Sequence, residues 1–172
     1  MAEREVRIGL IGGGLMGREL ASTAARWVHL DELGVRPRLV HVCDVDTRAL
    51  DALAATDPAL SRSACDVSDA EAVAGLFRTV TATLGGLDAL VNNAGIAGPT
   101  AACEDVALAD WERTLAVNLT GQFLCAQRAI PLLKASANAS IANLSSAAGR
   151  FGFPGRTPYA TSKWGVIGFT KS

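Results

Sequence analysis

Short apolar runs alternate with longer amphipathic segments along the chain. The short runs are rich in Val, Leu and Ile and are closed by Gly, Asn or Asp, which is typical of buried strands. They lie at residues 6–11, 38–43, 61–67, 87–91 and 140–144. Segments with the apolar spacing of helices separate them, at residues 15–30, 47–56, 68–84, 110–133 and 159–171.

This alternation of strands and helices predicts an α/β fold with a parallel sheet that is covered by helices on both faces. Because parallel crossovers are right-handed, the sheet is expected to be doubly wound, a Rossmann arrangement of about five strands in the order 3-2-1-4-5. Residues 1–172 show no repeat, linker or low-complexity tract, so we expect a single nucleotide-binding domain.

Polar and glycine residues predict where the helices begin and end. Asp46 or Thr47 is a suitable N-cap for the helix over 47–56. Ser68 and Glu71 have the S-x-x-E spacing of a capping box, which places a helix start at Ser68. Gly85 ends that helix in the usual manner of a C-terminal glycine.

Composition narrows the function classes. The chain has 172 residues, 49% of them hydrophobic and 19% charged, with a formal net charge of −1. A nucleic-acid partner is not expected, since there is no basic stripe with interleaved aromatic residues. The N-terminus is charged, and every long apolar stretch is interrupted, so we expect neither a signal peptide nor a membrane span. The four cysteines are scattered, which predicts free thiols in the cytoplasm and no metal site.

A glycine-rich loop follows the first predicted strand. Gly12, Gly14 and Gly17 have the G-x-G-x-x-G spacing, and the loop opens a helix. Glycines let the backbone approach a pyrophosphate, and the helix N-terminus offers unpaired N–H groups and a positive dipole. The loop predicts a dinucleotide site, the alternative being a tight strand–helix turn without a ligand.

Asp44 lies at the end of the second predicted strand. An acid at this position accepts hydrogen bonds from the ribose hydroxyls of NAD and repels the 2′-phosphate of NADP. NAD is therefore the expected cofactor, with NADP disfavoured. The alternative is that Asp44 only caps the helix that follows.

Tyr159 and Lys163 are four residues apart on the last predicted helix and therefore share a face. A nearby ammonium favours the phenolate, which lowers the pKa of a tyrosine toward the range of general acid–base catalysis. Ser146 ends the fifth predicted strand, where a hydroxyl can stabilise charge on a substrate oxygen. Ser145, one residue earlier, is the competing candidate and is expected on the opposite face.

The order of these motifs resembles the short-chain dehydrogenase/reductase family. The similarity is dense from about residue 60 to residue 172. It covers Cys65-Asp66-Val67, the segment from Leu87 to Gly95, Asn118, Asn143-Leu144-Ser145-Ser146 and the segment from Pro158 to Gly165.

This resemblance implies roles for four catalytic residues. Tyr159 is the acid/base, and Lys163 binds the nicotinamide ribose and lowers the tyrosine pKa. Ser146 orients the substrate carbonyl, and the family's spacing between serine and tyrosine favours it over Ser145. Asn118 holds a water in the proton relay.

The resemblance also implies cofactor contacts. Asp66 and Val67 contact the adenine, and Asn93, Ala94 and Gly95 line the cofactor.

The start of the chain resembles a different family. Short-chain dehydrogenases carry T-G-x-x-x-G-x-G after the first strand, which residues 9–17 do not match. Residues 6–17, with Val42-Cys43-Asp44-Val45-Asp46, resemble the Rossmann start of the Gfo/Idh/MocA oxidoreductases. The chain therefore resembles a chimera, joined between residues 47 and 64.

The resemblance predicts an oxidoreductase that moves a hydride between NAD(H) and a secondary alcohol or ketone. The family usually continues past the last helix and forms homo-oligomers, so we expect a C-terminal part to be missing and the oligomer interface to be incomplete. The alternatives are a nucleotide-binding scaffold with little or no turnover and a fragment of a Gfo/Idh/MocA-type sugar dehydrogenase.

Overall fold

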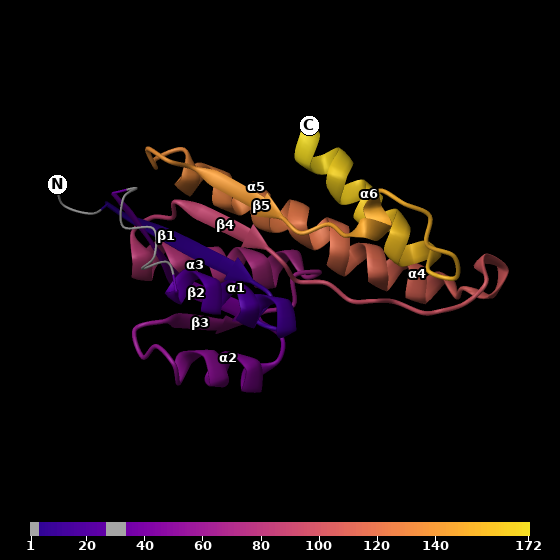
Figure 1. Cartoon of the computed structure of the whole chain (residues 1–172), viewed down its shortest axis with the longest axis horizontal. Helices are drawn as coiled ribbons and strands as arrows, with labels where there is room; N and C mark the ends of the chain where they lie inside the picture. Colours follow the sequence, from indigo (N-terminus) through magenta and orange to yellow (C-terminus); the bar gives the residue numbers. More distant parts are fainter. Residues whose placement is uncertain (1–3, 27–33) are drawn as a thin grey trace.

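The computed structural model describes residues 4–26 and 34–172 and contains one parallel sheet (Figure 1). Its strands are β1 (Arg4–Ile11), β2 (Val35–Asp44), β3 (Ser61–Ala64), β4 (Ala89–Asn92) and β5 (Ser140–Asn143). They lie side by side in the order β3-β2-β1-β4-β5, and every neighbouring pair is parallel. The predicted Rossmann order is confirmed.

The helices fill the crossovers between these strands. They are α1 (Leu15–Ala25), α2 (Thr47–Ala54), α3 (Ala70–Leu84), α4 (Leu108–Leu115), α5 (Gly121–Leu133) and α6 (Thr157–Lys171). Two short 3₁₀ turns are η2 (Cys103–Asp105) and η4 (Ala147–Gly149). The helix predicted over 15–30 is confirmed up to Ala25. Residues 27–30 of that prediction lie outside the described residues. No helix within the described ranges combines the length and apolarity required to cross a membrane.

Apolar side chains form a core on each face of the sheet. One core joins the sheet to α3 and α5 and includes Val73, Phe77, Val80, Leu90, Cys125 and Ala129. The other joins it to α2, with α1 packed alongside, and includes Leu10, Val42, Leu50, Leu53, Leu60 and Val91. Both faces of the central strands are therefore buried, as a parallel sheet requires.

The helix predicted as continuous over 110–133 is interrupted. It begins at Leu108, and a π-helical turn, η3 (Ala116–Thr120), joins α4 to α5. A π turn inserts one residue into a helix and is frequent at functional sites. The turn contains Asn118, whose side chain binds the loop after β4 at Ile96.

The chain between β3 and α3 also differs from the prediction. The third strand, predicted over 61–67, ends at Ala64, because the Asp66 carboxylate accepts a hydrogen bond from the Ser68 N–H at 2.9 Å and turns the chain. The predicted capping box at Ser68 is wrong. Asp69 caps α3 by accepting from the backbone N–H groups two and three residues further on. The predictions for Asp46 as a cap and Gly85 as a helix end are confirmed.

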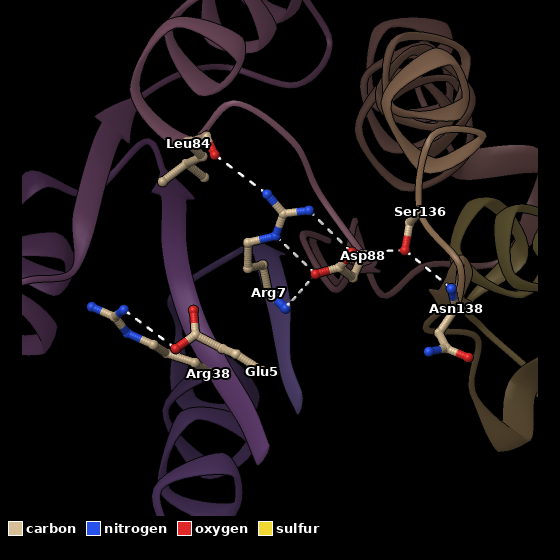
Figure 2. A network of polar contacts seen from close by, with 7 residues as sticks. All are labelled: Glu5, Arg7, Arg38, Leu84, Asp88, Ser136 and Asn138. Carbon is tan, nitrogen blue, oxygen red and sulfur yellow. Dashed lines mark hydrogen bonds and ion pairs between the residues drawn. The ribbon is translucent and has the colours of Figure 1, made fainter. Parts of the chain in front are cut away.

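An ion pair joins the first strand to the fourth at the end of the sheet where the strands begin (Figure 2). The Arg7 side chain donates to Asp88 through Nε at 2.8 Å and through Nη2 at 3.1 Å. Asp88 also accepts from the backbone N–H of Arg7 and from the Ser136 hydroxyl. A methyl group added to Gly86 would lie 2.9 Å from the guanidinium nitrogens, so the turn before β4 is shaped to admit this arginine.

Asp88→Asn is expected to lower the free energy of unfolding by about 1–2 kcal/mol at neutral pH, since it removes charge-assisted hydrogen bonds. The hydrogen bond from Arg7 holds the pKa of Asp88 well below its ordinary value. A depressed pKa stabilises the fold above the pKa of the unfolded state, and that contribution is lost as the pH falls below about 4. Denaturant unfolding of both proteins should show the difference shrinking from pH 7 to acid pH. If the difference in free energy of unfolding stayed constant with pH, the charge of Asp88 would contribute nothing to stability.

Candidate functional site

The carboxyl ends of β1, β2 and β4 surround a cleft of about 300 Å³. Ligands of open α/β sheets bind at this end of the strands, where the order of the sheet reverses. Eight of the predicted cofactor residues line the cleft, namely Gly12, Gly14, Asp44, Asp66, Val67, Asn93, Ala94 and Gly95. Gly17, Tyr159 and Lys163 are not among the lining residues.

Two glycines of the loop are required by close packing. Gly12 has a φ of +99°, and a methyl group there would lie 2.6 Å from the backbone nitrogen of Ala94. A methyl group on Gly17 would lie 2.1 Å from the carbonyl oxygen of Gly12. Gly17 therefore shapes the loop by letting α1 approach it closely.

Gly14 differs from both, because a methyl group there would meet nothing within 4 Å. It is the N-cap residue of α1 and makes no side-chain cap. The first N–H groups of α1 have no intrahelical partner and lie at the positive end of the helix dipole. This open helix start in a cleft fits a pyrophosphate, whose charge it would stabilise.

Asp44 connects the glycine loop to the second strand. One carboxylate oxygen accepts from the Gly13 N–H at 2.7 Å, and the other accepts from the Asp46 N–H at 2.8 Å. Each oxygen retains a further lone pair that can accept from a hydroxyl. Asp44 therefore holds the turn before α2 and lines the cleft. The alternative that Asp44 caps the following helix is wrong, because Asp46 is the N-cap of α2.

Asp66 and Val67 form another part of the cleft wall. Hydrogen bonds to Asp66, first that from the Ser68 hydroxyl, hold the pKa of its carboxyl below the ordinary value. Arg113 pairs with Asp66 at 3.1 Å and reaches across from α4. A methyl group on Gly121 would lie 2.7 Å from Val67, so α5 packs tightly behind this wall.

The segment after β4 forms the floor of the cleft. The N–H groups of Asn93 and Ala94 both donate to the carbonyl of Ile11, at 2.8 and 2.7 Å. The Asn93 amide donates to the carbonyl of Gly12 at 2.8 Å. The segment thereby locks the glycine loop in place, and Gly95 continues it toward Lys163.

Lys163 lies next to Tyr159 on α6, as predicted. Its Nζ is 5.7 Å from the centroid of the Tyr159 ring and donates to the Leu144 carbonyl at 2.8 Å. The side chain is buried, and this burial lowers the pKa of the Lys163 ammonium. A methyl group on Gly95 would lie 3.6 Å from Nζ, so the lysine borders the segment that lines the cleft.

Asn118 is fully buried, and its amide group is engaged with the protein. Its Oδ1 accepts from the Ile96 N–H at 2.7 Å, and its Nδ2 donates to the Ile96 carbonyl at 2.9 Å. The Nδ2 group also donates to the Ser162 hydroxyl at 3.1 Å. Both amide donors are engaged within the protein. The relay water that the resemblance implies stays a prediction, and an oxygen of Asn118 would have to hold it.

The two serines after β5 have different partners. Ser145 donates its hydroxyl proton to the Lys163 carbonyl at 2.7 Å. Ser146 accepts from the Ala148 N–H at 3.2 Å, and its own proton is donated to no group in residues 4–26 and 34–172. This geometry favours Ser146 as the residue that contacts a substrate oxygen.

Sequence reasoning missed several groups at this site. The Leu144 carbonyl that binds Lys163 has no signal in the sequence, because any residue carries a carbonyl. Ser162 was not singled out, although it holds Asn118 and stands directly before Lys163. Arg113 pairs with a predicted cofactor residue from a distant helix, which a linear sequence does not show.

Comparison with known proteins places this site in a family. The family model for short chain dehydrogenases matches residues 28–172. Trans-4-hydroxycyclohexanecarboxylate dehydrogenase of Sinomonas cyclohexanicum is 45% identical over 107 residues, which are 62% of this chain and 40% of that protein. The NAD(+) 2-dehydro-3-deoxy-L-rhamnonate dehydrogenase of Sphingomonas sp. (strain SKA58) is 40% identical over 125 residues, 71% of this chain and 50% of that protein. The solved structure of NAD+-bound xylitol dehydrogenase has a TM-score of 0.81 and 30% identity, over 99% of this chain and 64% of that one.

The chain belongs to the short-chain dehydrogenase family. The family match begins at residue 28, ahead of the join predicted between residues 47 and 64. The alignments cover 40% and 50% of the length of the two curated relatives.

Proposed function

We propose that this chain carries the site of an oxidoreductase that transfers a hydride between NAD(H) and a secondary alcohol or carbonyl compound. The observation that carries the proposal is the pairing of Tyr159 with buried Lys163 beside a glycine-lined cleft. A phenol next to an ammonium is suited to proton transfer at a reacting oxygen. Family membership supports the same reaction class.

Each catalytic residue has a distinct role in this proposal. In the oxidation direction the Tyr159 oxygen accepts the proton of the substrate hydroxyl, and in reduction it returns the proton. Lys163 favours the anionic form of the phenol. Ser146 donates its free hydroxyl proton to the substrate oxygen and stabilises charge there. Asn118 anchors η3 to the loop after β4 through Ile96 and would hold a water of the proton relay through an oxygen. When bound, NAD(H) supplies the hydride acceptor or donor.

The residues present fit a dinucleotide. Gly12, Gly14 and the open start of α1 would hold the pyrophosphate, and Asp44 would accept from the adenosine ribose. Asp66 and Val67 would contact the adenine, and Asn93, Ala94 and Gly95 would line the cofactor. Lys163 would bind the nicotinamide ribose beside Tyr159. Asp44 supports NAD over NADP, because its carboxylate would repel a 2′-phosphate.

Asp44→Asn is expected to weaken NAD+ binding by about 10-fold or more and to reduce the preference over NADP+, because it removes one charged acceptor. Calorimetric titration with each cofactor measures both affinities. Asp51→Asn is the matched control, since Asp51 lies on α2 outside the cleft lining and the change in net charge is the same. An unchanged NAD+/NADP+ ratio in Asp44→Asn would remove Asp44 from the cofactor site.

We further propose that the glycine loop derives from a Gfo/Idh/MocA-type start. The support is the G-x-G-x-x-G spacing of Gly12, Gly14 and Gly17 and a family match that leaves residues 1–27 outside. The Arg7–Asp88 ion pair joins that outside part to the matched part.

A direct assay tests the proposed function. Oxidation of NADH is followed by absorbance with a panel of ketones, and cofactor binding is measured separately by calorimetry. Turnover of any ketone supports the oxidoreductase, and NADH binding without turnover supports the nucleotide-binding scaffold. A small-molecule alcohol or ketone as partner and a cytoplasmic location belong to the same proposal.

A further inference from the structure

Arg156 immediately precedes α6 and lies over the aromatic rings of the site. Its guanidinium carbon is 5.9 Å from the centroid of the Phe153 ring and 6.0 Å from that of the Tyr159 ring. Its Nη1 group donates to the hydroxyl of Thr100, on the loop after β4. Arg156 therefore stands where the loops after β4 and β5 meet, next to the proposed proton-transfer residue.

This guanidinium has no carboxylate partner. In residues 4–26 and 34–172, no Asp or Glu oxygen lies within ion-pair distance of Arg156. Its Nε is buried without a hydrogen-bond partner, and Nη2 makes none within the same part of the chain. An arginine carries five N–H donors, so the contact with Thr100 leaves most of them unused. A half-buried charge with unused donors next to a reaction centre is suited to an anionic ligand.

The surroundings add positive charge to this position. Arg156 is the N-cap residue of α6, and no side chain of the described residues caps that helix. Because Pro158 has no N–H, the first-turn donors there are the N–H groups of Thr157 and Tyr159. The helix dipole places further positive potential there. Lys163 on the same helix carries a further positive charge, the ammonium beside the Tyr159 ring. An anion near Arg156 would be attracted by all three.

We propose that Arg156 binds a carboxylate of the substrate, so that the site takes hydroxy acids and keto acids in preference to neutral alcohols and ketones. The inference rests on the proposed function, because it places the reacting carbonyl at Tyr159. The planar guanidinium binds a carboxylate through two parallel hydrogen bonds, which fixes the orientation of the carbon chain. Arg156 is thereby a specificity-determining residue.

The competing explanation is that Arg156 only supports the Tyr159 ring by stacking on it. Arginine stacks on aromatic faces without any ligand, and each such contact contributes about 0.5–1 kcal/mol at exposed sites. This explanation predicts an equal loss of activity for acidic and neutral substrates, because both depend on the position of Tyr159. A preference for acids is expected only from direct binding of the carboxylate.

The test compares keto acids with their amides. Reduction of 2-oxo, 3-oxo, 4-oxo and 5-oxo acids and of the corresponding amides is measured with NADH, for the unaltered protein and for Arg156→Met. Methionine retains an unbranched apolar chain over the rings and removes the charge. For the best acid the ratio of kcat/KM between acid and amide should fall by about 10- to 100-fold, the value of a lost charge-assisted hydrogen-bond pair. The amide rate should fall by less than the acid rate, since only the acid carries the carboxylate that Arg156 would bind.

Two further variants sharpen the result. Arg156→Lys keeps the positive charge but lacks the planar guanidinium, and it should retain part of the preference for acids. Arg150→Met removes an exposed arginine from the same loop and should leave the ratio unchanged. An equal fall for acid and amide in Arg156→Met, or no preference for acids in the unaltered protein, overturns the inference while the oxidoreductase proposal stands.

A binding measurement separates the inference from the proposed function. Cyclohexanecarboxylate and cyclohexanecarboxamide, which carry no reacting carbonyl, are titrated against the protein with NAD+ present. Tighter binding of the carboxylate that disappears in Arg156→Met supports the anion site even if no ketone is reduced. Equal binding of both compounds overturns it, whatever the activity assay shows.

Discussion

Tyr159→Phe should reduce kcat/KM for ketone reduction by about 10²–10⁴-fold, the usual contribution of a positioned acid or base. The change removes only the phenol oxygen, which makes no hydrogen bond in the described part of the chain. The fold and the affinity for NADH are therefore expected to remain. Initial rates measure the loss, and calorimetry of NADH binding shows that the cofactor site is intact.

Thr161→Val is the matched control for this change. It also removes one hydroxyl from α6, at an exposed position that is not among the residues lining the cleft. Its rates should equal those of the unaltered protein. If Tyr159→Phe reduced ketones as fast as the control, Tyr159 would have no part in proton transfer and the proposed mechanism would be wrong.

The strand order was predictable because it depends on a pattern repeated along the whole chain. Each apolar run needs burial on both faces, and right-handed crossovers then permit few arrangements. The π turn was not predictable, because the segment Ala116–Thr120 carries no local signal for an extra residue. Its position is fixed by the hydrogen bonds between Asn118 and Ile96, which are far apart in the sequence.

The candidate site was predictable where the residue types and spacing of a motif indicate the chemistry. Tyr159 and Lys163 are paired by helical spacing, and the structure confirms that their side chains are neighbours. The environment of Arg156 was not predictable, because it is assembled from two loops that meet through Thr100. The choice between Ser145 and Ser146 likewise depended on which hydroxyl proton the fold uses.

The glycine loop shows that one motif can combine residues with different purposes. Gly17→Ala should destabilise the protein by about 3 kcal/mol or more, because its methyl group would lie 2.1 Å from a backbone oxygen that cannot move aside cheaply. The helix propensity of alanine offsets about 1 kcal/mol of the gross cost. Denaturant unfolding measures the difference.

Gly14→Ala is the matched variant with the opposite expectation. Its methyl group meets no atom within 4 Å, so the free energy of unfolding should change by no more than about 1 kcal/mol, the scale of an altered N-cap. Affinity for NAD+ should fall by about 10-fold or more, since the methyl group would occupy the space in which the pyrophosphate approaches the backbone.

The two variants together decide what the motif does. A stable Gly14→Ala protein with weakened NAD+ binding, beside a destabilised Gly17→Ala protein, assigns the ligand to Gly14 and the packing to Gly17. Unchanged NAD+ affinity in Gly14→Ala would favour a tight strand–helix turn that binds no pyrophosphate. A Gly17→Ala protein as stable as the unaltered one would show that α1 can withdraw from the loop, and the close approach to Gly12 would then not be required.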